Sequence, residues 1–310
     1  MLNLCHRENY KLMLDEQLIN DKFHVVPTCC CVANQSMFKS IPIEAYKLDD
    51  IALSETIIDV LINNMRIACN SCLNQENCAP FPGKFSEVAF IISHGVCNMK
   101  CRFCCVRELD NIKIFQEYDK VFRIIEALYN AGKLNVTSPL FHFAFTVGEF
   151  SIDSRQHTFY HKLEKLIPEA LIVWHSNCAV YSNIIGKGLS EGNRHLVVSI
   201  PHVDNKKFQY MTNSKYHIGT IFENLSRYHQ HLTNNSHPST NLTIRLFVHK
   251  LMDRTTINDF IEKVYEYGLQ RCIIDVRYMI DEKYGVEIDV YNDIKNYFNE
   301  NFKNGGDVLC

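Results

Sequence analysis

Residues 97–104 read Cys-Asn-Met-Lys-Cys-Arg-Phe-Cys, so Cys97, Cys101 and Cys104 are separated by three and then two residues. They follow the apolar run 88–92, which predicts a strand that leads into a loop. Three thiolates on so short a loop cannot pair with one another without strain, but they can converge on one inorganic core. A four-iron cubane normally takes four cysteine thiolates. Three close ligands therefore predict an iron–sulfur cluster in which one iron stays open to another ligand.

Zinc binding and plain burial are the two alternatives for these cysteines. Structural zinc sites are closed by two Cys-x-x-Cys knuckles or by Cys and His pairs, and no second knuckle follows closely here. Buried free cysteines suit apolar surroundings, whereas Asn98, Lys100 and Arg102 make this loop polar. The pattern therefore favours a cluster over both alternatives.

The motif resembles the signature of the radical SAM superfamily, Cys-x-x-x-Cys-x-x-Cys with an aromatic residue before the last cysteine, here Phe103. The resemblance covers roughly residues 84–280. It implies that the three cysteines hold a [4Fe-4S] cluster whose open iron binds S-adenosylmethionine (SAM), with Phe103 at the cofactor site. It further implies that reductive cleavage of SAM yields a 5′-deoxyadenosyl radical, which abstracts hydrogen from a carbon of the substrate.

Composition narrows the class of protein. The chain has 310 residues, of which 46% are hydrophobic and 22% charged, as is ordinary for a globular protein. A net charge of −3 predicts no nucleic-acid partner, and the sequence has neither a long apolar run nor a signal peptide that would indicate a membrane protein or export. Fourteen cysteines without an export signal predict metal ligands in a reducing compartment, hence the cytoplasm.

Residues 1–82 differ in pattern from the rest of the chain. A hairpin is expected from strands at 11–14 and 23–26, joined by the polar turn 15–21, and a helix is expected over 53–65. Seven cysteines flank these elements, namely Cys5, Cys29, Cys30, Cys31, Cys69, Cys72 and Cys78. Spacing alone does not select four metal ligands among them, and a structural zinc knuckle on the Cys69 and Cys72 pair is the alternative.

This order resembles the SPASM and twitch modules of many radical SAM enzymes, in which a hairpin and a helix lead into a Cys-x-x-Cys-x-x-x-x-x-Cys run. The resemblance implies an auxiliary iron–sulfur cluster, with Cys5, Cys29, Cys69, Cys72 and Cys78 as the expected ligands. Two departures matter, because the module precedes the barrel here and position 82 is Pro where a full run continues with another Cys. The missing cysteine at position 82 argues for one auxiliary cluster rather than two, and Cys310 is a further candidate ligand of that cluster.

Pro80, Pro82 and Gly83 mark the expected boundary between a first domain, 1–82, and a second, 83–310. In the second, strand-like and helix-like stretches alternate. Strands are expected at 87–92, 141–147, 170–175, 195–200, 242–248 and 271–279, and helices at 116–131, 153–166, 180–189, 218–231, 255–267 and 290–302. Such alternation predicts a parallel sheet, and six units fall short of a closed barrel. The expected fold is α/β: a partial (β/α)6 TIM-like barrel of the radical SAM type, preceded by a small Cys-rich α+β module.

Two expected strand ends carry residues that the resemblance assigns to SAM. Gly148 and Glu149 stand where the family has a Gly-Gly-Glu-like element that contacts the methionyl amino group, although Val147 replaces the first Gly. A solvated Glu149 is the alternative. Ser176 and Asn177 correspond to a ribose-contacting pair, and an Asx turn or helix cap is the alternative for them.

Two further residues complete the expected SAM site. Ser199 at the end of the fourth strand is a candidate contact to the ribose or to the methionyl carboxylate. Arg245 on the fifth strand offers a planar fork for that carboxylate, and an inward structural salt bridge is an equal alternative. Cys178, beside the Ser-Asn pair, is placed to reach the same pocket.

These features imply an enzyme that modifies a ribosomal peptide or a small metabolite with electrons from a reductant such as flavodoxin or ferredoxin. The reaction class stays open among oxidoreductase, isomerase and bond-forming maturase. A leader-binding winged-helix segment is not evident at the N-terminus, which weakens the peptide version. The second hypothesis is a non-catalytic iron–sulfur or zinc protein that transfers electrons or scaffolds a partner.

Overall fold

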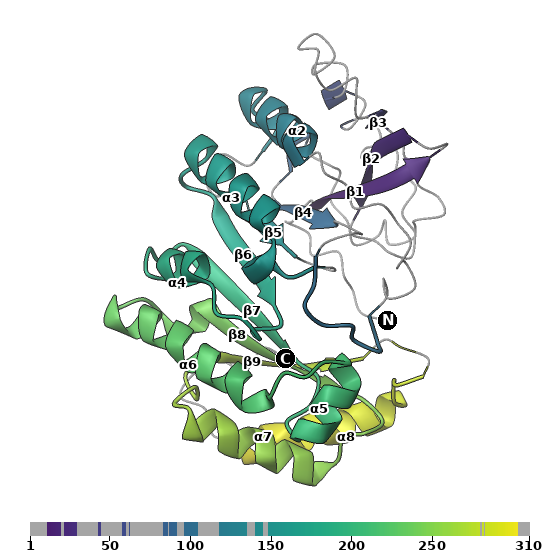
Figure 1. Ribbon diagram of the computed structural model, residues 1–310, viewed down its shortest axis with the longest axis vertical. Coiled ribbons are helices and arrows are strands. Elements are labelled where there is room, and N and C mark those ends of the chain that lie inside the picture. The colour runs from purple at the N-terminus through teal and green to yellow at the C-terminus, as the bar shows by residue number, and fades with distance from the viewer. Residues whose placement is uncertain are drawn as a thin grey trace. The chain divides into compact units, whose positions relative to one another are not determined.

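Figure 1 shows the computed structural model of the chain. It describes residues 11–19, 22–29, 43–44, 58–59, 62, 83–85, 87–91, 96–104, 118–134, 140–144, 148–279, 281 and 283–302. Most of the helix predicted over 53–65 lies outside these residues, as do Val147 and the predicted metal-ligand candidates Cys5, Cys30, Cys31, Cys69, Cys72, Cys78 and Cys310. Cys29 is described only as a strand residue. No helix in the described ranges combines the length and the apolar character that a membrane span requires.

The chain forms two compact units. The first consists of Met1–Gly95, Ile112–Gly148 and Asp153–Ile172, and the second of Val96–Asn111, Glu149–Ile152 and Val173–Cys310. Neither unit is one continuous segment, because the chain passes between them several times.

The first unit contains a mixed sheet with the strand order β3-β2-β1-β4-β5. These strands are β1 (Lys11–Ile19), β2 (Lys22–Cys29), β3 (Ile43–Glu44), β4 (Glu87–Ile91) and β5 (Leu140–Phe143). Strand β1 is antiparallel to β2 and parallel to β4, which is in turn parallel to β5. A strand of the predicted first domain thus pairs with one of the second. The boundary between residues 82 and 83 stays a prediction.

The predicted N-terminal hairpin is present, but its strands are longer than expected. Leu18 and Ile19 interrupt the polar stretch that was interpreted as a turn, and in the structure they belong to β1 and pair with Phe23 and Lys22. Only two residues separate β1 from β2. Asp15, Glu16 and Gln17 therefore belong to a strand instead of forming a loop.

Helices α2 (Tyr118–Asn130) and α3 (Ser154–Leu166) pack beside each other in the first unit. Asp153 caps α3 by accepting a hydrogen bond from the Arg155 amide at 3.1 Å. Phe159 of α3 lies edge-on to Phe122 of α2 and to Phe143 of β5, with ring centroids 5.7 and 5.9 Å apart. This aromatic contact joins both helices to the sheet.

Strand β5 is shorter than the predicted strand 141–147, because it ends at Phe143. The next residue, Ala144, has φ of 51°, which is left-handed backbone. A side-chain-bearing residue in that region turns the chain out of the extended conformation. The end of the strand is thereby fixed before the segment that leads to Gly148.

The second unit contains the strand order β6-β7-β8-β9. Its strands are β6 (Leu171–Ser176), which begins in the first unit, β7 (Arg194–Ile200), β8 (Leu242–Val248) and β9 (Ile273–Tyr278). The pairs β7/β8 and β8/β9 are parallel. Their apolar side chains are almost wholly buried, as expected for parallel strands covered by helices.

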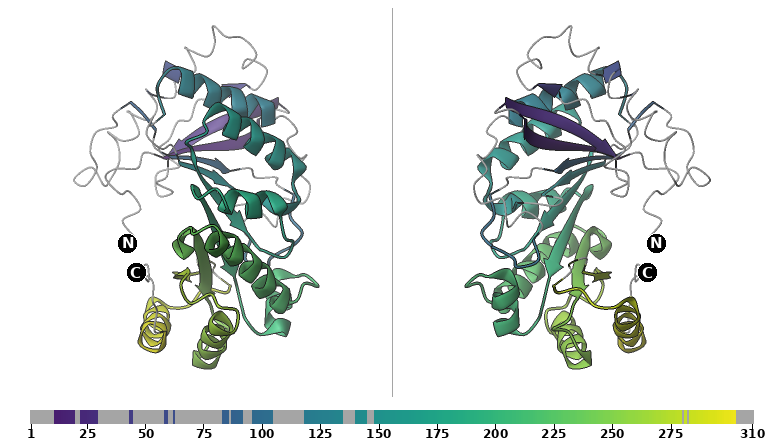
Figure 2. Two further views of the ribbon diagram at one scale, coloured as in Figure 1. Left: turned by 90° about the vertical axis from the view of Figure 1, so that its left-hand side faces the viewer. Right: turned by 90° about the vertical axis from the view of Figure 1, so that its right-hand side faces the viewer.

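Helices of the second unit lie along the outer side of its strands in Figures 1 and 2. They are α4 (Asn183–Leu189), α5 (Asn205–Thr212), α6 (Ile218–Asn234), α7 (Arg254–Glu266) and α8 (Ile288–Asn301), with 3-10 turns η5 (Phe150–Ile152) and η6 (Ser239–Asn241). Each of β4 to β9 is followed by at least one helix. The predicted α/β alternation of six strands with helices is therefore confirmed.

Helix α5 is absent from the prediction. It has eight residues, of which Phe208, Met211 and Thr212 are buried. A short, mostly polar helix offers too little periodicity to be recognised from sequence. Its ends are nevertheless well defined, because Asp204 accepts from the Lys207 amide and Asn213 closes the helix with left-handed backbone.

Candidate cofactor site

The three-cysteine loop is attached to the C-terminal end of α5. The Lys100 amide donates to the Thr212 carbonyl at 3.0 Å, and the Arg102 amide donates to the Met211 carbonyl at 2.8 Å. The last carbonyls of a helix have no partner within the helix, so they are free to accept such bonds. The loop backbone is thereby held by an element that the sequence did not reveal.

Two side chains of the loop strengthen this attachment. Arg102 donates from Nε to the Tyr210 carbonyl at 2.8 Å, and its guanidinium lies 4.3 Å from the centre of the Tyr210 ring. A cation at a helix C-terminus is also favoured by the helix dipole. Phe103 lies 6.1 Å from Phe247 of β8, centroid to centroid, and both pack against the buried cluster of Met211, Met279 and Tyr284.

The cysteine side chains on this loop differ in exposure. Cys97 is exposed, whereas Cys101 and Cys104 are half-buried. Although Cys97 is exposed as a residue, the surrounding chain desolvates its thiol and raises its pKa, and burial together with the neighbouring Cys97 raises the pKa of Cys101 to about 12. Among the described residues, no three Cys, His, Asp or Glu side chains lie close enough together to enclose a metal ion. To share a cluster, the cysteine side chains would therefore have to turn toward one another on the attached loop.

Glu149 lies beside this loop and is completely buried. Its amide donates to the Val96 carbonyl at 2.8 Å. Its Oε1 accepts from the hydroxyls of Ser176 at 2.7 Å and Ser151 at 2.8 Å, and from the Ser151 amide at 3.1 Å. Its Oε2 accepts from the Asn177 amide at 2.6 Å. Burial raises the pKa of Glu149, and these four hydrogen bonds oppose that rise.

Glu149 therefore holds the end of β6 in place. A carboxylate has about four lone-pair positions, and protein donors take four bonds here. The predicted contact of Glu149 to a methionyl amino group stays a prediction, as does the role of Gly148, which has left-handed backbone with φ of 83°. The alternative of a solvated Glu149 is wrong, because its side chain has no exposed surface.

Ser176 and Asn177 are both bonded within the chain. The Ser176 hydroxyl, which donates to Glu149, also accepts from the Cys178 amide at 2.8 Å. The Asn177 Oδ1 atom accepts from the Ala179 amide at 3.0 Å, which is the Asx turn weighed as an alternative to ribose contact. Cys178 is buried with φ of 59°, and burial raises the pKa of its thiol well above the usual range.

Asn177 also reaches the cysteine loop. Its Nδ2 donates to Asn98 Oδ1 at 2.7 Å and lies 3.8 Å from Cys97 Sγ. The Nδ2 of Asn98 is buried and has no hydrogen-bond partner among the described residues. Asn98 did not figure among the predicted site residues, although its place next to Cys97 was a signal that could have drawn attention to it.

Arg245 makes the salt bridge that was left open as an alternative. Its Nε donates to Asp275 Oδ2 at 2.9 Å, and the Arg277 Nε donates to the other oxygen at 2.6 Å. Ser199 pairs with Arg245 across β7 and β8, and Arg245 pairs with Asp275 across β8 and β9. Because two guanidiniums share one carboxylate, this group carries a net positive charge. Such a group can attract an anion such as a carboxylate.

The cofactor chemistry can be tested against these residues. Three cysteines lie on one short attached loop, and thiolates are the ligands that iron–sulfur clusters require. A buried amide donor without an acceptor lies next to the first of them, which suits an anionic occupant. The donor set therefore fits an iron–sulfur cluster with SAM.

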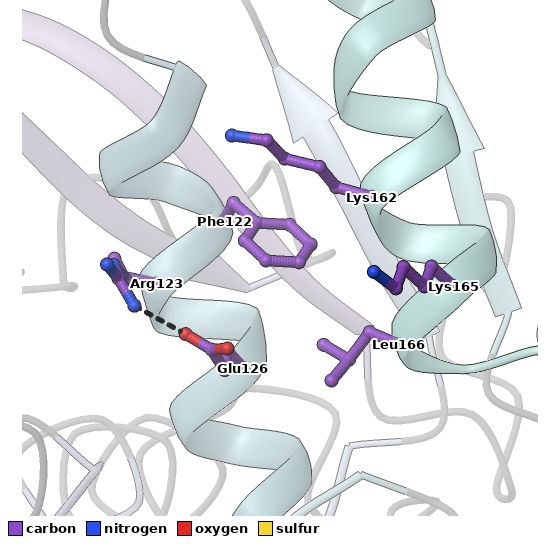
Figure 3. A pocket seen from close by; sticks show the side chains of 6 residues that line it. All are labelled: Phe122, Arg123, Glu126, Lys162, Lys165 and Leu166. Atoms are coloured by element: carbon purple, nitrogen blue, oxygen red, sulfur yellow. Dashed lines mark hydrogen bonds and ion pairs between the residues drawn. The ribbon is translucent and has the colours of Figure 1, made fainter.

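A separate hollow of about 450 Å³ lies between α2 and α3 of the first unit (Figure 3). Lys162 and Lys165 project from α3, and Lys162 Nζ lies 5.9 Å from the centre of the Phe122 ring. The lining residues are Phe122, Arg123, Glu126, Lys162, Lys165 and Leu166. Arg123 and Glu126 pair with each other at 2.9 Å, so the net positive charge of this lining comes from its two lysines. None of the predicted site residues lines this hollow.

Comparisons with known proteins support the fold. The solved structure titled "Native anSMEcpe with bound AdoMet" matches with a TM-score of 0.51 and 15% identity, over 69% of this chain and 59% of that chain. The Streptococcus suis protein SuiB matches with a TM-score of 0.51 and 12% identity, over 96% of this chain and 70% of that chain. No family model matches the chain, and no curated protein sequence matches it.

These likenesses define a class of fold. The α/β arrangement that this chain shares with both solved proteins fits the partial TIM-like barrel predicted from its sequence. At such low identities the likeness concerns the fold and not the reaction. The chain also spans only 59% of the first of these structures.

Proposed function

We propose that the protein is a radical SAM enzyme. Cys97, Cys101 and Cys104 would hold a [4Fe-4S] cluster, and SAM bound there would supply the 5′-deoxyadenosyl radical that abstracts hydrogen from a substrate carbon. The observation that carries this proposal is the three-cysteine loop attached to α5, beside the polar network of Glu149 and Asn177.

The residues around the loop have distinct tasks in this proposal. The α5 carbonyls fix the loop backbone, and Glu149 fixes the backbone of Asn177 at the end of β6. Phe103, packed on Phe247, would add apolar surface next to the cofactor, and a radical reaction needs water excluded. The chain would thus orient the cofactor and protect its reactive product.

SAM would lie against the predicted contact residues, Phe103, Gly148, Glu149, Ser176, Asn177, Ser199 and Arg245. The hydrogen bonds of two of these residues support more specific roles. Ser176 is bonded to Glu149, so its part would be to shape the strand end. Arg245 uses Nε for Asp275, so its terminal nitrogens would bind the methionyl carboxylate.

Several finer features belong to the same proposal. One auxiliary iron–sulfur cluster would be held by Cys5, Cys29, Cys69, Cys72 and Cys78, or by four of the N-terminal cysteines with Cys310 as a further candidate. The substrate would be a ribosomal peptide or a small metabolite, the electron donor a flavodoxin or ferredoxin, and the compartment the cytoplasm. The content of fourteen cysteines supports metal ligands in a reducing compartment.

SAM cleavage tests the proposal directly. We expect the anaerobically reconstituted, dithionite-reduced protein to form 5′-deoxyadenosine from SAM, measured by liquid chromatography and mass spectrometry. The triple variant Cys97→Ala, Cys101→Ala and Cys104→Ala should fall to background. Cys272→Ala, which removes a buried thiol that precedes β9, is the matched control and should retain the activity.

The non-catalytic alternative predicts a different outcome. An electron-transfer or scaffold protein would bind iron or zinc on the same cysteines but would form no 5′-deoxyadenosine. Metal content measured on the same samples separates the two functions. Wild-type protein that contains its iron and does not cleave SAM would contradict the proposed activity.

A further inference from the structure

The side-chain amide of Asn98 has only one orientation that satisfies its neighbours. The Ala179 amide donates to Asn177 Oδ1 at 3.0 Å, so the Nδ2 of Asn177 must face the other way. That Nδ2 lies 2.7 Å from Asn98, which must therefore present its oxygen. The direction of each amide is thus fixed by a backbone N–H, and Asn98 is left with its Nδ2 donor turned away from Asn177.

That remaining donor is in a costly position. The Nδ2 of Asn98 is buried and no described residue accepts from it. Buried amide donors nearly always have a partner in native proteins, because leaving one unpaired forfeits its hydration. The missing acceptor therefore points to something that binds at this place.

The surroundings indicate the chemistry of that acceptor. Asn98 directly follows Cys97, and Asn177 Nδ2 lies 3.8 Å from the Cys97 sulfur. The completely buried Glu149 accepts a hydrogen bond from the backbone N–H of Asn177 at 2.6 Å. A chain of hydrogen bonds thus runs from Glu149 through Asn177 to Asn98 and ends in a donor beside a predicted cluster ligand. An anionic acceptor suits the end of such a chain.

We propose that Asn98 donates its free Nδ2–H to an anionic acceptor of the bound cofactors and so positions them. This inference rests on the proposed function. The acceptor is either a sulfur of the cluster or the carboxylate of the SAM methionyl group. A donor to a cluster sulfur raises the reduction potential, because it stabilises the extra negative charge of the reduced state. A donor to the carboxylate instead tightens SAM binding.

Two variants of Asn98 test this role. Asn98→Ala removes the whole amide without adding charge, whereas Asn98→Asp keeps an oxygen for Asn177, loses the donor and adds a negative charge beside Cys97. Asn301→Ala, at the exposed end of α8, is the matched control. Iron and sulfide content is measured first. The midpoint potential is then followed by electron paramagnetic resonance without SAM, and the SAM dissociation constant is measured afterwards.

Each outcome has a distinct meaning. A more negative potential in Asn98→Ala, which adds no charge, with the control unchanged, supports a bond to a cluster sulfur. An unchanged potential with SAM binding weakened on the order of tenfold supports a bond to the carboxylate. Variants that hold full iron and match the wild type in both measurements overturn the inference. If the wild type itself holds no iron, the proposed function fails, and Asn98 is not the cause.

Discussion

Two buried carboxylates in the second unit are stabilised in opposite ways. Glu149 is completely buried and accepts hydrogen bonds from hydroxyl and amide groups. Asp275, 3% exposed, is held by the guanidiniums of Arg245 and Arg277. The hydrogen bonds to Glu149 position backbone and side chains without a counter-charge. The ion pairs of Asp275 leave a net positive charge, because two guanidiniums share one carboxylate. A hydrogen-bonded carboxylate therefore organises a strand end, whereas an ion-paired one leaves a group that can attract an anion.

Removing the Glu149 carboxylate should lower the free energy of unfolding more than any other change proposed here. Glu149→Ala leaves the Ser176 hydroxyl and the Asn177 amide buried without their acceptor, so we expect a loss of about 3–5 kcal/mol in the free energy of unfolding. Glu149→Gln keeps one oxygen and should lose less. Urea denaturation of the cluster-free variants measures both, and equal stabilities of Glu149→Ala and the wild type would show that the network contributes nothing.

The second-largest loss of stability is expected from protonation of a buried histidine, which extends the comparison from the two carboxylates to a neutral group. His249 is fully buried, donates from Nε2 to the Pro201 carbonyl and accepts from the Leu251 amide at Nδ1. Burial and the nearby His202 lower the pKa of His249 to about 4. In the unfolded chain the imidazole takes up a proton below its usual pKa of about 6.5, whereas in the folded chain it stays neutral down to about pH 4. The contribution of neutral His249 to the free energy of unfolding is therefore fully present above about pH 6.5 and is lost as the pH falls toward 4.

The size of this pH effect follows from the shift. Between pH 6.5 and 4 we expect about 3 kcal/mol to be lost through His249. His249→Gln removes the ionisable ring and should flatten this part of the profile, whereas His161→Gln, at an exposed position of α3, should not. Urea unfolding at several pH values measures the slope. Identical slopes in His249→Gln and the wild type would contradict the assignment.

The smallest loss of stability is expected when the ion pairs of Asp275 are removed. Asp275→Asn removes the charge that Arg245 and Arg277 share, and both side chains are partly exposed, 25% and 49%. Solvent screening limits the loss to about 1–2 kcal/mol, and salt should reduce it further. Thermal melts at low and high salt measure this. A loss as large as that of Glu149→Ala would remove the distinction between the two carboxylates.

Much of the fold could be predicted because its strands are apolar and regularly spaced. The strand predicted at 195–200 is β7, Arg194–Ile200, and that at 242–248 is β8. Strand ends are harder, since β5 stops at the left-handed Ala144, whose backbone angle no periodicity reveals. The pairing of β1 with β4 joins residues far apart in the chain, and local patterns carry no information on it.

The sequence indicates which residues to consider for the candidate site, but it does not indicate which of them are hydrogen-bonded to one another. The spacing of the motif singles out Cys97, and the family resemblance at two expected strand ends singles out Glu149 and Asn177. That Glu149 is bonded to Asn177, 28 residues away, required the structure. Helix α5 was missed because eight mostly polar residues show little amphipathic pattern, yet its carbonyls hold the loop.

Iron and acid-labile sulfide in anaerobically purified protein test the central claim most directly. The account predicts that the triple variant Cys97→Ala, Cys101→Ala and Cys104→Ala contains about four irons and four sulfides per chain fewer than the wild type, the content of one cubane. Its electron paramagnetic resonance spectrum after reduction should lack the signal that SAM perturbs in the wild type. Equal iron and sulfide in the two proteins, or zinc in their place, would contradict the claim that this loop holds a cluster.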